Sequence, residues 1–349
     1  MNRPPPRSRP TIEDVAAASG VSVATVSRAL RGLPNVALAT RERVLAAAAE
    51  LEYETDPQAS RLASGRTMTV GLVAPLFGTW YADRVVTGAE SILADAGLDL
   101  LVAPVRDVQT LGMFLDRARS FGRRVDGALL IDLYVDSSQS ERLEAMGVPM
   151  VSVGEELGSA PSVTIDNVAA ARTAATHLVE LGHTRVGLIG GAHEGAILSP
   201  VPAHREQGWR EALVGSGLSA GEDLVVDGGF TVEGGAAALA DLLDGDHPPT
   251  AVFCMSDRMA LGAMTEAWRR GLRVPGDLAV VGFDDDDLAA AFGITTMRQP
   301  VADLGVRAAS MLVGLISGED PAVGGTAPVE LILRATTAPP ARAAPGPAR

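Results

Sequence analysis

A chain of 349 residues exceeds one ordinary domain, and its content of 47% hydrophobic and 4% aromatic residues is typical of folded, core-forming proteins. The one cysteine, Cys254, excludes a disulfide within the chain, and its position in an apolar run predicts a small buried side chain rather than a reactive thiol. The sequence shows no signal peptide and no uncharged apolar run of about 18 residues, which argues against a secreted or membrane-spanning protein.

The net charge of −14 is unevenly distributed along the chain. Residues 1–66 contain 9 arginines and 7 acidic residues, whereas residues 67–349 contain 20 arginines and 36 acidic residues. The acidic excess therefore belongs to the large C-terminal part, where it favours solubility. The N-terminal part is slightly basic, so we expect its nonspecific attraction to nucleic-acid phosphates to be modest.

Residues 11–31 predict two short helices joined by a tight turn. Thr11 can cap the first helix, whose first turn carries two acidic residues, as the helix dipole prefers. Gly20 ends this helix because glycine tolerates the left-handed conformation that a tight turn needs. Ser22 caps the second helix, which is expected over Val23–Leu30. This arrangement is typical of a DNA-binding helix-turn-helix.

The second of these helices is expected to present small and polar side chains outward. Val26 and Leu30 lie at i, i+4 and pack inward, which leaves the start of the helix able to approach a DNA major groove. Small side chains there can contact thymine methyl groups, and arginine can contact a guanine edge. The predicted DNA-contacting residues of this segment are Thr11, Ser22, Val23, Ala24, Thr25, Ser27 and Arg28. An ordinary helical hairpin with a solvated polar face is the alternative.

The rest of the N-terminal part and the two chain ends have simpler patterns. A third helix, over about residues 40–51, is expected to cover the apolar face of the first two and to complete a DNA-binding domain at 11–56. Residues 57–66 are expected to form a linker. Residues 1–10 and 338–349 are rich in proline, so we expect a disordered arm and a disordered tail.

Residues 67–337 alternate short apolar runs with helical segments rich in alanine and leucine. Apolar runs begin at Val70, Leu98, Gly127, Met150, Val186, Leu224, Ala251 and Ala279, and helices are expected at 82–96, 111–122, 138–146, 167–181, 204–216, 232–244 and 257–271. Strands that alternate with helices predict doubly wound parallel sheets, and these strands are too many for one sheet of usual size. We therefore expect two α/β subdomains, with a ligand cleft between them at the carboxyl ends of the strands.

These motifs together resemble the LacI/GalR family of bacterial transcriptional regulators. The matching segments are Thr11–Ala16, Ser19–Arg28, Val70–Pro75, Val125–Gly127, Gly147–Pro149, Asp166-Asn167, Leu181–His183, Asp257–Ala260 and Val281–Asp285. The resemblance implies a cytoplasmic homodimer in which a small-molecule effector controls the helix-turn-helix headpiece. It also implies a periplasmic-binding-protein-like effector domain at 67–337. Its first subdomain is expected at 67–163 and 294–322, and its second at 164–293 and 323–337.

Residues 57–66 match the hinge of this family, which forms a short helix on operator binding, pairs with the hinge of its partner and inserts a leucine into the minor groove. By position that leucine is Leu62, and Arg61 and Ala63 flank it as further predicted DNA contacts. A flexible tether is the alternative. Ala37 departs from the family because it replaces a serine or threonine helix cap. Glu52, Glu54 and Asp56 also depart from the family, and together with Glu50 they form an acidic stretch that should weaken binding to phosphates.

Polar and aromatic residues at predicted strand and helix ends form the candidate effector site. The resemblance assigns effector contacts to Arg205 and Asp284, and it places Trp80 and Tyr81 as an aromatic pair at the cleft mouth. The full predicted set is Trp80, Tyr81, Asp136, Arg205, Phe230, Ser256, Asp257 and Asp284. Carboxylates, an arginine and aromatic rings suit a sugar, with a purine or nucleoside as the second possibility. A structural Arg205–Asp284 salt bridge and core packing of the aromatic pair are the alternatives.

No catalytic or metal-binding pattern accompanies this site in the sequence. The acidic run Asp284–Asp287 has no histidine cluster beside it, and the five histidines lack zinc-ligand spacing. A chain without lysine contains no GxxxxGK[ST] loop, and neither GxSxG nor GxGxxG occurs in a fitting context. A solute-binding protein would explain residues 67–337 but not residues 11–66. We therefore expect a dimeric repressor of a near-palindromic operator, with no enzymatic activity, cofactor or metal.

Overall fold

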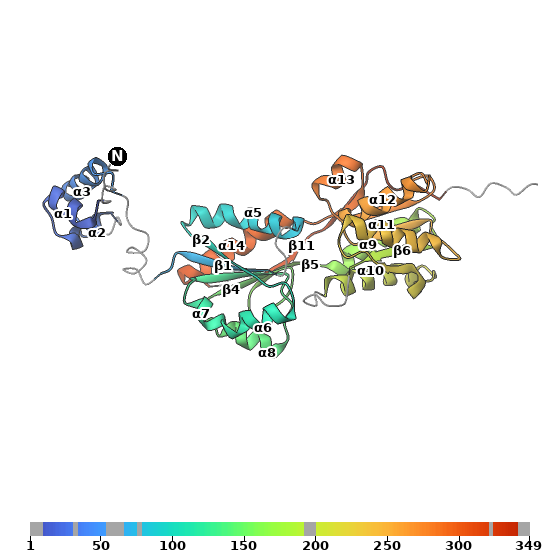
Figure 1. Cartoon of the computed structure of the whole chain (residues 1–349), viewed down its shortest axis with the longest axis horizontal. Coiled ribbons are helices and arrows are strands. Elements are labelled where there is room, and N and C mark those ends of the chain that lie inside the picture. Colours follow the sequence, from blue (N-terminus) through green and yellow to red (C-terminus); the bar gives the residue numbers. More distant parts are fainter. Residues whose placement is uncertain are drawn as a thin grey trace, which may run out of the picture. The chain divides into compact units, whose positions relative to one another are not determined.

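The computed structural model describes residues 10–30, 34–53, 66–74, 79–191, 200–320 and 324–340. The chain divides into two compact units, Met1–Thr67 and Met68–Arg349 (Figure 1). Among the described residues, no helix has both the length and the apolar character needed to cross a membrane.

The described part of the first unit is a bundle of α1 (Ile12–Ser19), α2 (Val23–Leu30) and α3 (Leu38–Glu50). A reciprocal capping box between Thr11 and Asp14 starts α1, and Gly20 ends it in the left-handed conformation, with φ of 66°. Helix α3 begins directly after Ala37, whose side chain cannot form a cap hydrogen bond. The three helices share a small core in which Val15, Val26 and Val44 are fully buried. The predicted helix-turn-helix headpiece is confirmed.

The first subdomain of the second unit is a parallel sheet with helices on both faces (Figure 1). Its strands, in spatial order, are β11 (Gly325–Ala327), β5 (Ser162–Ile165), β4 (Met150–Val153), β3 (Gly127–Ile131), β1 (Thr69–Ala74) and β2 (Asp99–Pro104). Helices α5 (Trp80–Asp95) and α14 (Val301–Ser317) pack together on one face. The other face carries α6 (Val108–Asp116), α7 (Ala118–Gly122) and α8 (Ser137–Glu144).

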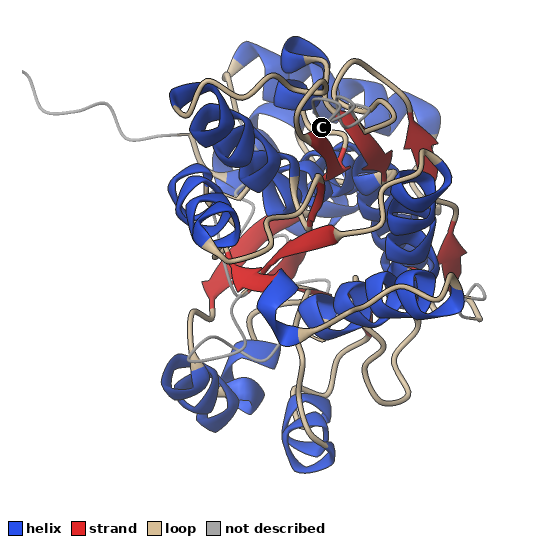
Figure 2. Cartoon of the chain, turned by 90° about the vertical axis from the view of Figure 1, so that its right-hand side faces the viewer, coloured by secondary structure: helices blue, strands red, loops and turns tan. Residues whose placement is uncertain are grey.

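The second subdomain repeats this architecture (Figure 2). Its strands, in spatial order, are β12 (Glu330–Ile332), β10 (Thr295–Arg298), β9 (Ala279–Asp284), β8 (Ala251–Cys254), β6 (Val186–Gly190) and β7 (Val225–Asp227), all parallel except β12. Helices α9 (Asn167–Glu180) and α10 (Val201–Gly215) pack as one pair, and α11 (Val232–Asp244) packs with α12 (Asp257–Arg269). The short helix α13 (Asp287–Phe292) packs against α12. The predicted fold of two doubly wound parallel-sheet subdomains is confirmed.

The apolar runs of the sequence form the central strands because these strands are covered on both faces. Every residue of β3, β6 and β8 is buried. Glycine permits the closest helix contacts: a Cβ at Gly88 would lie 2.0 Å from the Ala302 carbonyl oxygen, and a Cβ at Gly305 would lie 2.1 Å from the Val85 carbonyl oxygen. Any side chain at these two positions would push α5 and α14 apart.

The chain crosses between the two sheets after β5, after β10 and after β11. These crossings differ from the predicted subdomain borders at 164, 294 and 323. Strand β5 belongs to the first sheet through Ile165, β10 lies in the second sheet, and β11 lies in the first. The short strands β5, β10 and β11 contain no long apolar run. They form by pairing with distant strands, so a local sequence pattern does not reveal them.

Candidate functional sites

The outward surface of α2 consists of small and polar side chains, with one arginine. Val23 is 40% exposed, and Ala24 and Arg28 are also exposed, whereas Val26 is buried in the headpiece core. Ser22 caps the helix by accepting from the backbone N–H of Thr25 at 3.2 Å. The backbone at the start of α2 can therefore approach a partner surface closely, as a recognition helix must in a major groove.

Thr11 and the three hinge residues are further predicted DNA contacts. Thr11 is exposed, and its hydroxyl hydrogen-bonds the Asp14 carboxylate at 3.0 Å in the capping box. Arg61, Leu62 and Ala63 lie outside the described residues, as do Glu54 and Asp56 of the acidic stretch. The hinge helix and its leucine wedge stay predictions.

In the second unit, Arg205 of α10 is the centre of a buried polar cluster. Its side chain is 5% exposed, and its guanidinium lies 3.5 Å from the centroid of the Phe283 ring. Its Nε donates to Asn167 Oδ1 at 2.9 Å, and its Nη1 donates to the Met255 carbonyl at 2.5 Å. These partners stand at the start of α9 and at the end of β8. The arginine is therefore held where strands β8 and β9 end, the usual ligand position in such sheets.

Several carboxylates, among them Asp132, Glu155 and Asp284, interact electrostatically with this guanidinium. Asp284 ends β9 with φ of 114°, and its Oδ1 accepts from Gln299 Nε2 at 2.6 Å. Asp132 and Glu155 follow β3 and β4 of the first subdomain. Burial raises the pKa of Asp132 and of Asp284 to about 7 and that of Glu155 to about 8, while the charge of Arg205 acts in the opposite direction. The cluster therefore combines acids from one subdomain with the arginine of the other.

Tyr81 joins the cluster from α5. A Cβ at Gly154 would lie 2.0 Å from Asp132 Oδ1 and 3.1 Å from the Tyr81 hydroxyl, so both groups converge on this glycine. Burial and the nearby Asp132 carboxylate raise the pKa of Tyr81 well above its ordinary value, which keeps the phenol protonated. The hydroxyl is thus available as a hydrogen-bond donor.

Glu155 Oε1 of this cluster and Trp80 Nε1 of α5 are buried and have no hydrogen-bond partner within the described part of the chain. Buried polar groups are nearly always paired, by protein, water or ligand. The orphaned indole belongs to the predicted aromatic pair, whereas the orphaned carboxylate belongs to a residue that was not predicted. Arg84 lies 5.9 Å from the centroid of the Trp80 ring and forms an ion pair with Asp287 of α13 at 2.7 Å.

Four other predicted effector residues have local structural partners. Asp257 is fully buried, accepting from Thr296 Oγ1 at 2.6 Å and from the Asp286 backbone N–H at 2.9 Å. Ser256 caps α12 directly after Met255, whose carbonyl holds Arg205. The remaining two are Phe230, which is 39% exposed and packs on Gly191, and Asp136, which is exposed and caps α8.

Sequence reasoning missed Asp132 and Glu155. Both follow strands that the sequence predicts, Gly127–Ile131 and Met150–Val153, so their position at a carboxyl strand end was a usable signal. It missed Asn167 and Gln299 for another reason. They act by holding Arg205 and Asp284, and no local pattern reveals those pairings.

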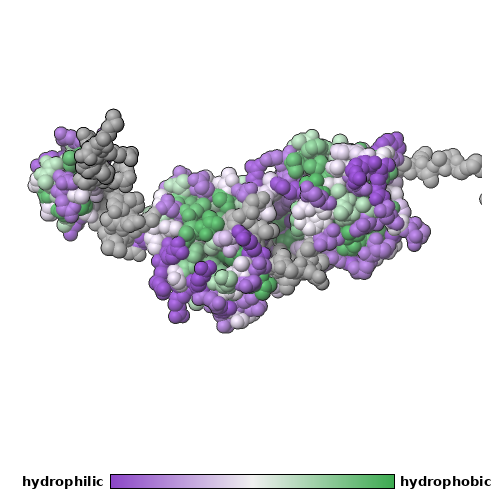
Figure 3. Space-filling model, viewed as in Figure 1, coloured by the Kyte–Doolittle hydropathy of each residue, from purple (hydrophilic) through white to green (hydrophobic). Residues whose placement is uncertain are grey.

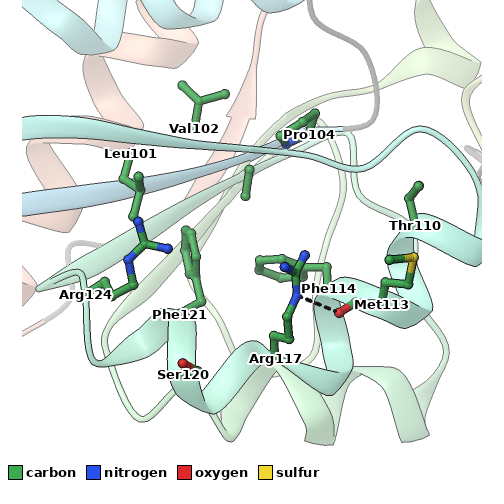
Figure 4. Close-up of a pocket in the computed structure, with 11 residues that line it drawn as sticks. Leu101, Val102, Pro104, Thr110, Met113, Phe114, Arg117, Ser120, Phe121 and Arg124 are labelled. Atoms are coloured by element: carbon green, nitrogen blue, oxygen red, sulfur yellow. Dashed lines mark hydrogen bonds between the residues drawn. The ribbon is translucent and has the colours of Figure 1, made fainter.

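A separate hollow lies on the first subdomain, beside its edge strand β2 (Figure 4). The cavity is about 460 Å³, with Leu101 of β2 and the edge-to-face pair Phe114 and Phe121 along its apolar side. Its lining also includes Arg117 and Arg124. Two exposed apolar side chains, Val102 and Met113, line it, and Val108 at the start of α6 is also exposed. Such an apolar face beside an open sheet edge is typical of an interaction surface.

Comparison with known proteins finds two family models that match this chain. Residues 11–56 match "Bacterial regulatory proteins, lacI family", and residues 175–337 match "Periplasmic binding protein-like domain". The transcriptional regulator CelR of Thermobifida fusca is 38% identical, over 94% of this chain and 96% of its own. The transcriptional repressor CytR of Escherichia coli is 36% identical over the same shares.

Solved structures give the same result. A CelR–cellobiose complex has a TM-score of 0.69 at 35% identity and covers 94% of this chain and all of its own. The lac repressor dimer bound to operator has a TM-score of 0.84 at 27% identity and covers 95% of this chain and all of its own. These relatives are regulators rather than enzymes. The chain belongs to the LacI family of bacterial DNA-binding transcriptional regulators.

Proposed function

We propose that this regulator is a repressor that acts in the cytoplasm as a homodimer on a near-palindromic operator and is controlled by a small-molecule effector, a sugar. One observation carries the proposal: a single chain joins an exposed surface on α2 to an α/β unit with a buried polar cluster around Arg205, in which Glu155 Oε1 has no hydrogen-bond partner among the described residues. The α2 surface is suited to binding DNA, and the cluster is suited to binding a small polar molecule.

The α2 surface supports reading of bases rather than nonspecific attraction to phosphates. Val23 and Ala24 are exposed and small, and Arg28 is exposed and carries a side chain of the kind that contacts a guanine edge. Residues 1–66 carry only two more arginines than acidic residues. One headpiece therefore gains little from phosphate attraction, and two copies on two half-sites are needed for tight binding.

Exposed apolar residues support the homodimer. On the first subdomain they lie on β2 and α6, at Val102, Val108 and Met113. On the second subdomain Phe292 of α13 and Trp268 of α12 are 44% and 48% exposed, and the two helices pack together. Figure 3 shows hydrophobic surface around β2 and around α13. A second copy that covers both regions would remove this apolar area from water. The lac repressor, a relative by fold and sequence, is a dimer on its operator.

The cluster around Arg205 supports a sugar effector. Carboxylates accept from sugar hydroxyls, an arginine donates to them, and an aromatic residue such as Trp80 packs on the apolar face of a sugar ring. CelR, to which this chain is similar along its length, has been solved with cellobiose. A nucleoside also carries hydroxyls and a stacking ring, and it is the alternative that a ligand screen must include.

Effector control follows from where the cluster stands. Asp132 and Glu155 come from the first subdomain, and Arg205 comes from the second. Asp284 accepts a hydrogen bond from Gln299, which lies where the chain crosses between the subdomains, after β10 and before α14. A ligand that bridges these groups stabilises one arrangement of the two subdomains over another. It controls DNA binding only through its differential affinity for the two arrangements.

The proposal is tested by selecting duplexes from a random pool with the full-length protein. We expect enrichment of a near-palindromic sequence, and repression of a reporter placed behind it. A thermal-shift screen of sugars and nucleosides then identifies the compound that alters this repression. Enrichment of a single, non-repeated half-site, or repression that no stabilising compound changes, would contradict the proposal.

A further inference from the structure

We propose that four arginines of the first subdomain bind backbone phosphates of the DNA that the headpiece recognises: Arg117, Arg119, Arg123 and Arg124. The second unit then contacts DNA directly, outside the helix-turn-helix and outside the predicted hinge. This contact supplies phosphate attraction that residues 1–66 lack, since they contain only two more arginines than acidic residues. The inference goes beyond the proposed function and does not depend on the identity of the effector.

The four arginines form a basic cluster in an acidic unit. They lie in and beside the short helix α7, within residues 117–124, and this segment contains no acidic residue. Residues 67–349 as a whole contain 36 acidic residues against 20 arginines. All four arginines are exposed, whereas Ala118 and Phe121 between them are buried and fix α7 to the subdomain. The cluster is therefore a local reversal of charge on a firmly packed segment.

No carboxylate is paired with these arginines within the described part of the chain. Arg117 donates from Nε to the Met113 carbonyl at 3.2 Å, a contact that leaves its charge in place. Elsewhere in the same unit, arginines such as Arg142, Arg172 and Arg270 form ion pairs with acidic residues at 2.5 to 3.0 Å. The cluster thus keeps its charge for an anion from outside the protein, and arginine binds phosphate through paired N–H donors.

The cluster stands beside the point where the chain enters this unit from the headpiece. Asp126, two residues after Arg124, accepts from the Met68 backbone N–H at 2.8 Å. The backbone N–H of Asp126 donates to the Thr69 carbonyl at 2.7 Å, at the start of β1. The loop that carries Arg123 and Arg124 is therefore bonded to the end of the linker.

The length of the linker limits how far the bound DNA can be from this loop. Residues 53 and 66 are separated by 13 residues, which span at most about 45 Å when fully extended. The centres of two operator half-sites are themselves about 34–36 Å apart, and a duplex carries one phosphate charge per about 1.7 Å of its axis. Phosphates of a duplex held by the headpiece are therefore within reach of the cluster.

A second copy of the chain does not by itself neutralise the cluster. Arg117 and Arg124 line the hollow beside β2 together with Val102 and Met113, which the proposed dimer covers (Figure 4). In a two-fold dimer the same patch of each copy faces the other, so these arginines approach those of the partner and repel them. A polyanion that runs past both copies neutralises both sets, and DNA is the polyanion that this family binds.

The test measures DNA affinity of the full-length protein by fluorescence anisotropy over a range of salt concentrations. It uses the selected duplex and a random duplex of equal length. Two variants each remove half of the cluster: Arg119→Gln/Arg123→Gln and Arg117→Gln/Arg124→Gln. The control, Arg106→Gln/Arg273→Gln, removes two exposed arginines outside the cluster and changes the net charge equally. Because the cluster arginines have no carboxylate partner to lose, both cluster variants should keep the melting temperature of the parent.

Each lost phosphate contact should lower the slope of log affinity against log salt by about 0.9, and the affinity at 0.1 M salt by about 8-fold. We expect at least one cluster variant to show both changes, whereas the control keeps the slope of the parent. The loss should be equal on the selected and the random duplex, because phosphate contacts do not depend on sequence.

Three results overturn the inference. The first is a slope and an affinity that match the control in both cluster variants. The second is a loss of affinity at unchanged slope, or a loss confined to the selected duplex, since phosphate contacts produce neither. The third is a cluster variant whose reduced slope is accompanied by dissociation into monomers in analytical ultracentrifugation without DNA, because the arginines then act on assembly rather than on DNA.

Discussion

Removal of the Arg205 guanidinium should separate effector response from DNA binding. In Arg205→Ala, Asn167 Oδ1 and the Met255 carbonyl lose their donor, and Asp132 and Asp284 lose the cation that faces them. Removing one partner of a buried charged set costs about 3–5 kcal/mol. Because Asp132 and Asp284 have pKa values of about 7, they can take up protons instead. The loss should therefore be smaller near pH 5.5 than near pH 8.5.

The matched control for this variant is Arg210→Ala, on the same helix α10. Arg210 pairs with Glu206 and Glu222 at a partly exposed surface, so its removal should cost only about 0–1 kcal/mol. Arg205→Lys keeps the charge but loses the forked geometry, and it should lie between the two alanine variants.

Stability is measured by denaturant unfolding at both pH values, and response by operator binding with and without effector. Arg205→Ala should bind operator but ignore the effector, since the headpiece is a separate compact unit. The reasoning is refuted if Arg205→Ala loses no more stability than Arg210→Ala, or if its operator binding still responds to the effector.

Three further changes test other parts of the molecule. Arg28→Ala should lose about 1–3 kcal/mol of specific operator binding, measured as the affinity ratio between operator and random DNA; an unchanged ratio would remove Arg28 from the base contacts. Val102→Asp/Met113→Glu should shift the protein from dimer to monomer in analytical ultracentrifugation, whereas Val214→Asp, at an apolar position that is more exposed than either, should not; a dimer that persists would place the interface elsewhere. Glu54→Arg should raise operator affinity and steepen its salt dependence; equal affinity and slope would show that the acidic stretch does not weaken binding.

The headpiece and the central strands were predictable from local pattern. Thr11, Gly20 and Ser22 mark helix ends through their own side chains or backbone, so a short window of sequence suffices. Strands such as β3 and β6 are buried on both faces and therefore appear as continuous apolar runs. By contrast, β10 and β12 are short strands defined by pairing with distant parts of the chain: β10 pairs in parallel with β9 and antiparallel with β12. Helix α14 was not among the predicted elements.

The candidate effector site was predictable only in part. Arg205 and Asp284 were found through the family resemblance, and strand-end logic alone would have added Asp132 and Glu155. The buried geometry of the arginine depends on Asn167 and Met255, which are 38 and 50 residues away along the chain. Such partners are set by how the helices and strands pack, and no spacing in the sequence reports them.

We propose that each chain of a dimer carries a headpiece that binds one operator half-site and an effector site that controls this binding. The most direct test is a fluorescence anisotropy titration of the full-length protein on its selected duplex and on a duplex with one half-site scrambled, each with and without saturating effector. We expect tight binding only to the intact duplex, and a change in that affinity of at least about fivefold on effector addition. Equal affinity for both duplexes, or affinity that the bound effector leaves unchanged, would contradict the account.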